Sequence, residues 1–440
     1  MKKGVIRIVL PLWLMFFFSG CFVAENTFTG LAPGYWRATL RLETTPAGEI
    51  LAKSKQQALE DIVIGELPFN FEVKYEHKDK FYLEIINGEE RIRVDEIVLR
   101  RDPRTAKDSV YIDFPVFDSY IRGIFQENVI QGEWIVRNRA DYAIPFVARH
   151  GQNHRFTTLK KAPAMNLSGK WEATFEIDTP DEYKAIGDFQ QNGNYITGTF
   201  ATETGDYRFL EGTVQGDKLH LSCFDGAHAF LFEAKIQADS TLIGSFYSGN
   251  HYKTTWEAHR NDSFKLVAPE KLTFLKEGYD RFEFSFENPE GKLISINDPA
   301  YQGKVKIVQI MGTWCPNCRD ETEFLLDYLK NNPNEDLAVI GLAFERHKEK
   351  SKAMGAISRY KNYFGISYEM LLAGSSDKAE ASKALPMLNQ VLSFPTMIFI
   401  DRENKVQKIH TGFYGPATAE FKDFKAEFET FLQELLDKPL

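Results

Sequence analysis

Two cysteines separated by two residues, Cys315 and Cys318, are the part of this sequence best suited to carry out chemistry. The residues before them, Lys304 to Met311, have the apolar, β-branched pattern of a buried strand, and the apolar residues after them recur at helical spacing. A thiol pair at a strand-to-helix junction can close into a small disulfide ring, and the N-terminus of a helix favours the thiolate form of a cysteine. The motif therefore predicts reversible thiol–disulfide exchange, in which Cys315 attacks and Cys318 resolves the mixed disulfide.

The other cysteines of the chain, Cys21 and Cys223, lie far from this pair in the sequence. A structural zinc site would need further ligands, and no second C-x-x-C motif occurs. Cys223 falls in an alternating, strand-like run, so we expect a small buried residue rather than a reactive thiol. We therefore expect no metal, and no cofactor apart from a redox-active Cys315–Cys318 disulfide.

Length and composition exclude several classes of protein. The chain has 440 residues, which predicts about three domains. A formal charge of −9 argues against a general nucleic-acid binder, because neutralising phosphates requires concentrated lysine and arginine. Charged residues make up 26% of the chain, which is typical of globular proteins and argues against extensive disorder. Four cysteines are too few for a disulfide-rich scaffold.

Residues 1–20 have the pattern of a signal for export. The chain begins with Met and two lysines, and an apolar run from Val9 to Phe18 has about half the length that would span a bilayer. Small residues then precede Cys21, which resembles a bacterial lipoprotein signal, in which cleavage before Cys21 leaves this residue to carry lipid. An ordinary cleaved signal, or an uncleaved anchor with an incidental Cys21, is the alternative. We expect an exported protein of the cell envelope or periplasm, held to a membrane by this lipid.

The region between the signal and residue 262 consists of short alternating segments separated by Gly, Asn, Asp and Pro, a pattern that predicts β-strands and turns. It contains an internal repeat, since two pairs of segments match in spacing and residue type: Gly34–Leu40 with Gly169–Phe175, and Ile130–Trp134 with Leu242–Phe246. Two copies of roughly 90 to 120 residues each are too few and too long for a solenoid. They predict two related antiparallel β modules, sandwich-like or barrel-like. We place the first module at residues 25–155 and the second at residues 164–262.

Four polar residues of the second module could meet at one of its ends: Asp206, Arg208, Asp225 and His228. Turn chemistry accounts for them first, because Asp-Gly and Thr-Gly-Asp are sequences typical of tight turns. A binding surface for a partner or ligand is the alternative.

The last part of the chain, residues 275–440, alternates strand and helix patterns and predicts an α/β domain with a mixed sheet. The expected strands are residues 282–286, 293–296, 304–311, 337–344, 396–400 and 405–410. The expected helices begin after Cys318, at Lys348 and at Thr418. The fold class predicted for the whole chain is therefore multidomain, with two β-rich modules followed by a C-terminal α/β domain.

The order hairpin, strand, W-C-x-x-C, helix, and proline before the next strand is met here by Trp314 to Cys318 and by Ser393 to Thr396. In these motifs residues 275–440 resemble a thioredoxin-fold domain, and more closely the exported TlpA/ResA-like thiol-disulfide oxidoreductases. The resemblance implies that Pro395 is cis and lies opposite the active-site sulfurs. It also implies that Trp314, Phe394 and Pro395 contact the substrate chain.

The same resemblance implies a buried acid that moves protons during disulfide exchange. Glu321 matches the position of this acid in ResA-like proteins, whereas Gln309 occupies the place, six residues before Cys315, where thioredoxin itself has an acid. An exposed carboxylate that stabilises the first turn of the helix is the alternative role of Glu321. We expect its neighbours Asp320 and Glu323 to be solvated.

The whole chain, with its lipoprotein-like signal, β-rich region and C-terminal TlpA-like domain, resembles exported proteins of Bacteroidetes type. These patterns together predict an envelope-tethered thiol-disulfide oxidoreductase that reduces protein disulfides and receives electrons from a membrane donor. The expected partners are a disulfide-containing protein substrate, this donor and the membrane itself, and not a nucleic acid. Redox direction depends on the relative stability of the oxidised and reduced forms and stays open.

Two other functions are open at this point. The aromatic-rich repeats would suit a surface-binding protein in which the β modules recruit a partner and the redox domain serves them. A thiol peroxidase would share the thioredoxin fold. Peroxidases of this kind carry a Thr three residues before the reactive cysteine, whereas this chain has Gly312 at that place relative to Cys315.

Overall fold

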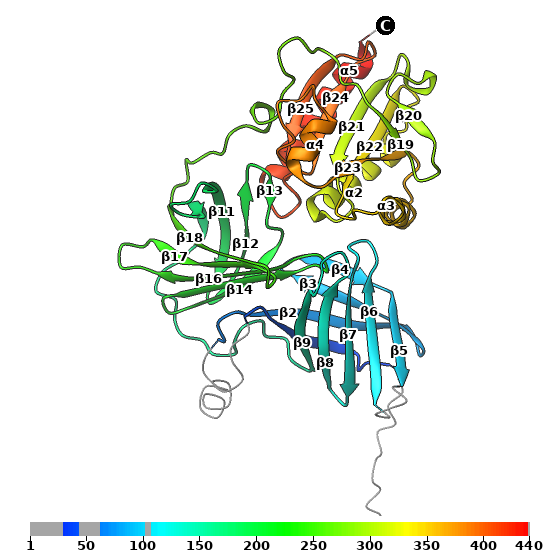
Figure 1. The fold of residues 1–440 in the computed structure, drawn as a ribbon. Coiled ribbons are helices and arrows are strands. Elements are labelled where there is room, and N and C mark those ends of the chain that lie inside the picture. The colour runs from blue at the N-terminus through cyan, green and yellow to red at the C-terminus, as the bar shows by residue number, and fades with distance from the viewer. Residues whose placement is uncertain (1–29, 44–61, 102–106, 439–440) are drawn as a thin grey trace, which may run out of the picture.

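The computed structural model describes residues 30–43, 62–101 and 107–438 of the chain. The predicted export signal and Cys21 lie outside the described residues. Within them, two sheets of nine strands each are followed by a seven-stranded sheet that is covered by helices (Figure 1). This confirms two β-rich modules followed by a C-terminal α/β region. Among the helices of the described part, none has the length and apolar character needed to cross a membrane.

The first module is an open antiparallel sheet. Its strands are β1 (Gly34–Arg41), β2 (Glu66–His77), β3 (Lys80–Asn87), β4 (Glu90–Val94), β5 (Ile97–Arg101), β6 (Asp108–Phe114), β7 (Ser119–Gln126), β8 (Val129–Val136) and β9 (Ala143–His150). They lie in the order β4-β3-β2-β1-β9-β8-β7-β6-β5. The first strand in the chain, β1, therefore pairs with the last, β9, in the middle of the sheet. Successive residues alternate between the two faces, and Trp36, Ala38 and Leu40 of β1 are therefore fully buried.

The second module is a closed antiparallel barrel. Its strands are β10 (Gly169–Phe175), β11 (Tyr183–Asn192), β12 (Tyr195–Thr202), β13 (Gly205–Asp206), β14 (Leu210–Gln215), β15 (Lys218–Phe224), β16 (Ala229–Ile236), β17 (Leu242–Ser248) and β18 (Tyr252–Arg260). The ring closes because β11 pairs with both β10 and β12, and β18 pairs back onto β10. Closure removes free sheet edges and encloses an aromatic core that includes Phe175, Phe200, Phe232 and Trp256.

The internal repeat predicted from the sequence is present in both modules. Trp36 Nε1 donates to the carbonyl oxygen of Ala32 at 2.9 Å, and Trp171 Nε1 donates to that of Leu167 at 2.9 Å. Each tryptophan lies on the first strand of its module, and this strand pairs with the last one. The modules differ in closure, since the first sheet is open and the second forms a ring.

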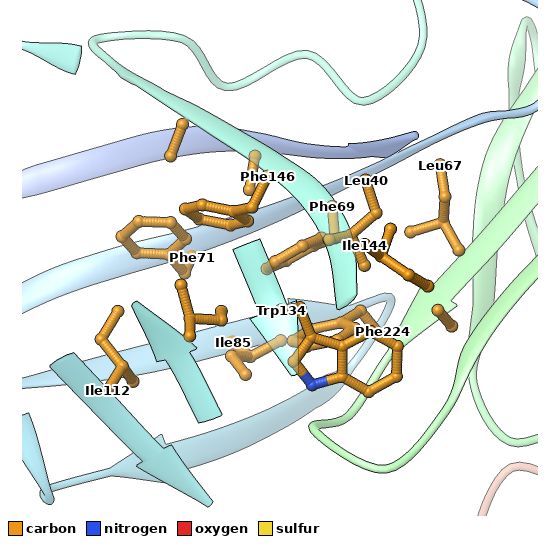
Figure 2. Close-up of a cluster of buried hydrophobic side chains, with 14 of the residues drawn as sticks. Leu40, Leu67, Phe69, Phe71, Ile85, Ile112, Trp134, Ile144, Phe146 and Phe224 are labelled. Atoms are coloured by element: carbon orange, nitrogen blue, oxygen red, sulfur yellow. The ribbon is translucent and has the colours of Figure 1, made fainter. Parts of the chain in front are cut away.

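One side chain of the barrel fills part of the core of the first module. Phe224, at the end of β15, stacks on Phe69 with ring centroids 4.3 Å apart and lies nearly perpendicular to Trp134 at 5.2 Å. Figure 2 shows its ring among the side chains of the first sheet. The neighbouring Cys223 is fully buried with a free thiol, which confirms the predicted core role. The two modules therefore share a hydrophobic core where they meet.

The C-terminal region is a mixed sheet covered by helices. Its strands are β19 (Ser285–Glu287), β20 (Leu293–Ser295), β21 (Val305–Met311), β22 (Leu337–Glu345), β23 (Glu369–Ser375), β24 (Thr396–Ile400) and β25 (Val406–Thr411). Its α-helices are α2 (Pro316–Asn331), α3 (Lys350–Phe364), α4 (Lys378–Ala384) and α5 (Glu420–Asp437), and short 3₁₀ turns cover Pro269–Lys271 and Pro299–Tyr301. The strand order is β20-β19-β23-β22-β21-β24-β25, with β22 parallel to both β21 and β23.

The predicted elements of this region are present with changes of bounds, and the structure adds two elements. The strand predicted at residues 282–286 is shortened to β19, and the helix predicted to begin after Cys318 begins at Pro316. Strand β23 and helix α4 lie between the helix predicted to begin at Lys348 and the strand predicted at residues 396–400. Helix α4 has 7 residues, which is too short for a clear helical period in the sequence. Every residue of the central strand β21 is buried, and this strand fixes where α2 begins.

Candidate active site

Cys315 and Cys318 lie at the junction of β21 and α2, as predicted. Strand β21 ends at Met311 and α2 begins at Pro316, so Cys315 is the N-cap residue of the helix. Its Sγ accepts a hydrogen bond from the backbone N–H of Cys318 at 3.3 Å, which satisfies a free donor of the first turn. Both cysteines are free thiols. Cys315 is 6% exposed and Cys318 is fully buried, so Cys315 is the more accessible of the two.

Pro395 follows Phe394 through a cis peptide bond beside the cysteine pair. The Cys315 thiol donates to the carbonyl oxygen of Phe394 at 3.3 Å. The ring of Trp314 packs at 78° against the ring of Phe394, with centroids 5.8 Å apart. The structure thus brings together around Cys315 the three residues that the resemblance assigns to substrate contact.

Glu321, expected as a buried acid, is fully buried on α2. Gln309 Nε2 donates to Glu321 Oε2 at 2.9 Å and to the carbonyl oxygen of Cys318 at 3.4 Å. The second carboxylate oxygen, Oε1, has no hydrogen-bond partner among the described residues. Burial, with a smaller contribution from the charge of Cys315, raises the pKa of Glu321 to about 8. The alternative of an exposed first-turn carboxylate is therefore wrong.

Cys318 is strongly disfavoured as a thiolate. Burial raises the pKa of Cys318 well above that of an ordinary thiol, and its interactions with Cys315 and the charge of Glu321 raise it further. A thiol with such a pKa becomes a nucleophilic thiolate only after it loses its proton to a base. Glu321 is a buried carboxyl group whose charge contributes to this shift in the pKa of Cys318.

A second buried acid, Glu345, ends strand β22 and was not predicted. Its carboxylate accepts hydrogen bonds from the Thr313 backbone N–H at 3.0 Å and from Thr313 Oγ1 at 2.9 Å. Burial raises the pKa of Glu345 to about 7. These contacts fix the turn that leads from β21 to Cys315. A charged residue directly after the apolar run Leu337–Phe344 is the sequence signal that could have pointed to it.

Arg346 adds a positive charge beside the cysteine pair, and it was not predicted either. Its guanidinium carbon lies 4.0 Å from the ring centroid of Trp314. Burial and repulsion from Arg139 of the first module lower the pKa of Arg346 to about 10. A negative charge on Cys315 acts in the opposite direction and raises this pKa. Arg346 therefore interacts electrostatically both with Cys315 and with Arg139 of the first module.

Asp320 is not solvated, and the expectation that it would be is wrong. Its Oδ2 lies 2.6 Å from Nη1 of Arg208 in the barrel, and its side chain is 11% exposed. Burial raises the pKa of Asp320 to about 7, although the charge of Arg208 opposes this shift. The sequence of α2 cannot show that a neighbouring module covers this face of the helix. Glu323 is exposed, as expected, and pairs with Arg319 at 2.9 Å.

The four polar residues singled out in the second module do meet, at the end of the barrel that faces α2. Arg208 Nε lies 3.1 Å from Asp225 Oδ2, and its guanidinium also pairs with Glu90 of the first module. The backbone N–H groups of His228 and Arg208 donate, each at 2.6 Å, to Oδ1 of Asp225 and of Asp206 respectively. The predicted turn chemistry is present, and the cluster in addition joins the barrel to both of its neighbours.

Residues 204–206 of the barrel lie against the cysteine motif, and Figure 1 shows β13 at this contact. Asn317 Nδ2, between the two cysteines, donates to the carbonyl oxygen of Asp206 at 3.3 Å. Ser393 Oγ, next to the cis peptide, donates to the carbonyl oxygen of Thr204 at 2.8 Å. The barrel segment 204–206 therefore contacts both the first turn of α2 and the loop before the cis proline.

A cavity of about 730 Å³ lies where the two β modules and the C-terminal region meet. The C-terminal region contributes Trp314 and Leu392, which are near Cys315 and Phe394 in the chain. The barrel contributes aromatic side chains, and the first module contributes Arg139. The cavity is therefore next to the cysteine pair and is shared by all three parts of the molecule.

Comparison with known proteins assigns the C-terminal region. Residues 280–426 match the Redoxin family. Thioredoxin-like protein YneN of Bacillus subtilis is 26% identical over 159 residues, which is 36% of this chain and 82% of YneN. Thiol-disulfide oxidoreductase ResA of the same organism is 24% identical over 138 residues, which is 31% of this chain and 69% of ResA. The C-terminal part of the chain is a Redoxin domain homologous to these two proteins.

Solved structures match a similar share of the chain. The crystal structure of a thiol:disulfide interchange protein of the thioredoxin family from Chlorobium tepidum covers 37% of this chain and 98% of its own, with 23% identity and a TM-score of 0.28. The thioredoxin domain of a thiol-disulfide oxidoreductase from Bacteroides vulgatus covers 36% of this chain and 99% of its own, with 20% identity and a TM-score of 0.27. The Redoxin match begins after the two β modules.

Proposed function

We propose that the Redoxin domain catalyses thiol–disulfide exchange and reduces the disulfides of protein substrates through Cys315 and Cys318. One observation carries this proposal: Cys315 caps α2 and directs its thiol to the carbonyl oxygen of Phe394 at 3.3 Å, directly before the cis proline. A partner sulfur, that of Cys318, follows one turn later on the same helix. The similarity to ResA, a thiol-disulfide oxidoreductase, supports the same class of reaction.

The reductive reaction begins with the dithiol. The Cys315 thiolate attacks one sulfur of the substrate disulfide, the substrate S–S bond breaks, and the displaced substrate thiolate takes up a proton. Cys318 then loses its proton and attacks Sγ of Cys315 in the mixed disulfide, which releases the second substrate thiol. Two electrons have passed to the substrate, and Cys315 and Cys318 are left as a disulfide.

Glu321 is assigned the transfer of the Cys318 proton. A carboxyl group whose pKa is raised to about 8 can hold or release a proton near neutral pH. Its free oxygen, Oε1, has no competing hydrogen bond among the described residues, whereas Oε2 is held by Gln309. Gln309 is therefore a positioning residue for this carboxyl group. Trp314, Phe394 and Pro395 are assigned to substrate contact.

The oxidised pair must be reduced again before the next turnover. We assign this step to a membrane electron donor, so that the Cys315–Cys318 pair is the only redox group that the proposal requires. The signal-like residues 1–20 support export, and Cys21 is the proposed point of lipid attachment that would hold the protein in the cell envelope.

Substitution of the two cysteines tests this function. With a protein disulfide such as that of insulin as substrate and dithiothreitol as reductant, Cys315→Ser should abolish turnover. Cys318→Ser should still attack the substrate but accumulate the mixed disulfide, which intact-protein mass spectrometry detects. Cys223→Ala, at the buried cysteine away from the site, is the control and should keep turnover. Retained turnover in Cys315→Ser would refute the proposal.

The direction of exchange is tested separately. The reduction potential of the Cys315–Cys318 pair, measured by equilibration with glutathione buffers, should be strongly reducing if the domain acts as a reductase. A high potential would instead assign the domain to disulfide formation or isomerisation, with the same two cysteines in the same roles.

A further inference from the structure

The cavity beside the cysteine pair has the size of a ligand site. Its volume of about 730 Å³ lies within the range typical of pockets that hold small molecules. The barrel segment 204–206 contacts the site at Asn317 and Ser393, whereas the cavity reaches the site at Trp314 and Leu392. Cys315 is 6% exposed, so a substrate needs a defined route to it. The cavity adjoins Cys315 at the preceding residue, Trp314.

Two arginines that face this cavity have no ion pair within the described part of the chain: Arg139 and Arg346. Each packs instead on an aromatic ring, Arg139 at 5.3 Å from the centroid of Tyr142 and Arg346 at 4.0 Å from that of Trp314. Both side chains are partly buried, and their mutual repulsion contributes to the lowered pKa of Arg346. Two partly buried guanidinium groups that line the same cavity can bind an anion, and a carboxylate is an anion that arginine binds well.

The other charged groups of the cavity leave this positive character in place. Lys184 donates to Thr174 Oγ1 at 2.8 Å and pairs with Glu172 at 3.4 Å, while Lys378 adds a further cation. Two acids, Asp181 and Glu203, also line the cavity. Burial lowers the pKa of His251 to about 4, so this histidine is neutral at pH 7. With the lysines and arginines counted against the two acids, the lining is net positive.

The barrel contributes aromatic side chains to the lining of the cavity. Tyr183 and Tyr207 join their hydroxyl groups at 2.7 Å, and Phe230 packs perpendicular to Tyr207 with centroids 5.1 Å apart. All three side chains line the cavity. Such a lining binds an apolar or planar group through burial and ring contacts. A ligand that fits both the arginines and these rings therefore has a carboxylate and an apolar body.

We propose that this cavity is a substrate-recognition site for disulfides that carry a carboxylate, with the carboxylate bound by Arg139 and Arg346 and the disulfide presented to Cys315 past Trp314. This inference rests on the proposed exchange reaction and names its substrate class. The β modules supply Arg139 and the aromatic side chains, so they select the substrate of the Redoxin domain. The carboxylate can belong to a low-molecular-weight disulfide or to an acidic residue beside a cysteine in a polypeptide, because both present the same chemistry.

Two aromatic disulfides of similar size provide the test. Dithiobis-nitrobenzoate carries a carboxylate on each ring, whereas dithiodipyridine is uncharged at pH 7.5. Stopped-flow absorbance gives the rate constant for the reaction of the reduced full-length protein with each. The ratio of the two rate constants isolates carboxylate recognition, because a change in the reactivity of Cys315 itself alters both.

We expect Arg139→Gln to lower this ratio by about tenfold, the effect of losing one charge-assisted hydrogen bond. Arg139→Lys should restore most of the ratio, which a purely structural role of Arg139 would not predict. Arg149→Gln, at an exposed arginine of the same module, is the matched control and should leave the ratio unchanged. A ratio equal in Arg139→Gln and in the unsubstituted protein would overturn the recognition site while leaving disulfide exchange intact. Failure of the unsubstituted protein to react with either disulfide would instead contradict the proposed function.

The source of the carboxylate is resolved with peptides. Disulfide-linked peptides whose cysteine is flanked by Glu should react faster than peptides flanked by Gln, and Arg139→Gln should remove this difference, if polypeptides are the substrates. If the difference is present for dithiobis-nitrobenzoate and absent for the peptides, the site selects low-molecular-weight disulfides. Absence of both differences contradicts the proposal.

Discussion

Arg208 of the barrel and Asp320 of helix α2 form an ion pair, with Nη1 and Oδ2 2.6 Å apart, in the first turns of the helix that Cys315 caps. The same guanidinium contacts Glu90 of the first module and Asp225 of the barrel. One buried cation therefore joins all three parts of the molecule. Because three carboxylates face it, removing Arg208 leaves buried negative charge without compensation.

We expect Arg208→Met to weaken the contact between the barrel and the Redoxin domain. Removing one partner of a buried ion pair costs about 3–5 kcal/mol, so this variant should lose stability by that order of magnitude. Urea unfolding measures the loss, and hydrogen exchange should become faster in α2 and β13. The matched control is Arg122→Met, whose pair with Glu133 is exposed and contributes at most about 1 kcal/mol. Equal effects of the two substitutions would show that Arg208 does not hold the modules together.

The transfer of a proton from Cys318 should depend on Glu321. We expect Glu321→Gln to slow the release of substrate from the mixed disulfide by about 100-fold, the lower range of general acid–base effects. The first attack of Cys315 on dithiodipyridine should change much less, because that step needs no proton from Cys318. Single-turnover kinetics separate the two steps. Glu323→Gln, at an exposed acid on the same helix, is the control and should leave both rates unchanged. If Glu321→Gln also leaves both rates unchanged, Glu321 does not transfer the proton of Cys318.

The same carboxyl group should also make stability depend on pH. The pKa of Glu321 is raised from 4.5 to about 8 in the folded protein, so the folded state binds this proton more tightly than the unfolded state. Its contribution to the free energy of unfolding is therefore fully present below about pH 4.5, declines as the pH rises to about 8, and is constant above that. Each pKa unit corresponds to about 1.36 kcal/mol, which sets the scale at a few kcal/mol.

Glu321→Gln removes this proton linkage. Relative to the unsubstituted protein, the variant should gain stability as the pH rises between these two values, as measured by urea unfolding at a series of pH values. Other buried acids, such as Glu345, titrate in both proteins and cancel in the difference. A difference that stays flat across the range would show that the pKa of Glu321 is ordinary.

Much of this site could be predicted from the sequence because its signals are local. The spacing of Cys315 and Cys318, the strand before them and the helix after them lie within one continuous segment. The roles of Glu321 and Pro395 followed from the resemblance to ResA-like proteins, which these local motifs carry. The β repeat was visible for the same reason, since Trp36 and Trp171 occupy equivalent places in matching runs.

Contacts between modules could not be predicted, because they depend on which surfaces meet. Asp320 has the sequence context of a solvated helix residue, and its burial follows from Arg208, which is distant in the chain. The same holds for Phe224, which reads as part of an ordinary strand and yet fills the core of a different sheet. That Arg139 and Arg346 line one cavity could not be predicted either, because one belongs to the first module and the other to the Redoxin domain.

Gly205 offers a direct test of whether the barrel segment controls access to Cys315. An added Cβ at Gly205 would lie 2.1 Å from Asn317 Nδ2, and the residue has φ +138°, a conformation that other residues rarely adopt. Gly205→Ala should therefore displace the Asn317 amide, remove its hydrogen bond to the carbonyl oxygen of Asp206 and loosen the contact between the segment and the cysteine motif. If the substitution destabilises the closed form by about 1.4 kcal/mol, the equilibrium shifts tenfold toward the open form. Alkylation of Cys315 by iodoacetamide should then accelerate by about this factor.

Gly193→Ala separates this steric effect from backbone strain. Gly193 also has a positive φ of +60°, but an added Cβ there meets nothing within 4 Å. Both substitutions strain a positive-φ glycine, whereas only Gly205→Ala creates a clash with the residue between the two cysteines. If the two variants alkylate at the same rate, the segment 204–206 does not limit access, and the 6% exposure of Cys315 is set within the Redoxin domain itself. If Gly205→Ala alone is faster, the barrel segment 204–206 limits access to Cys315.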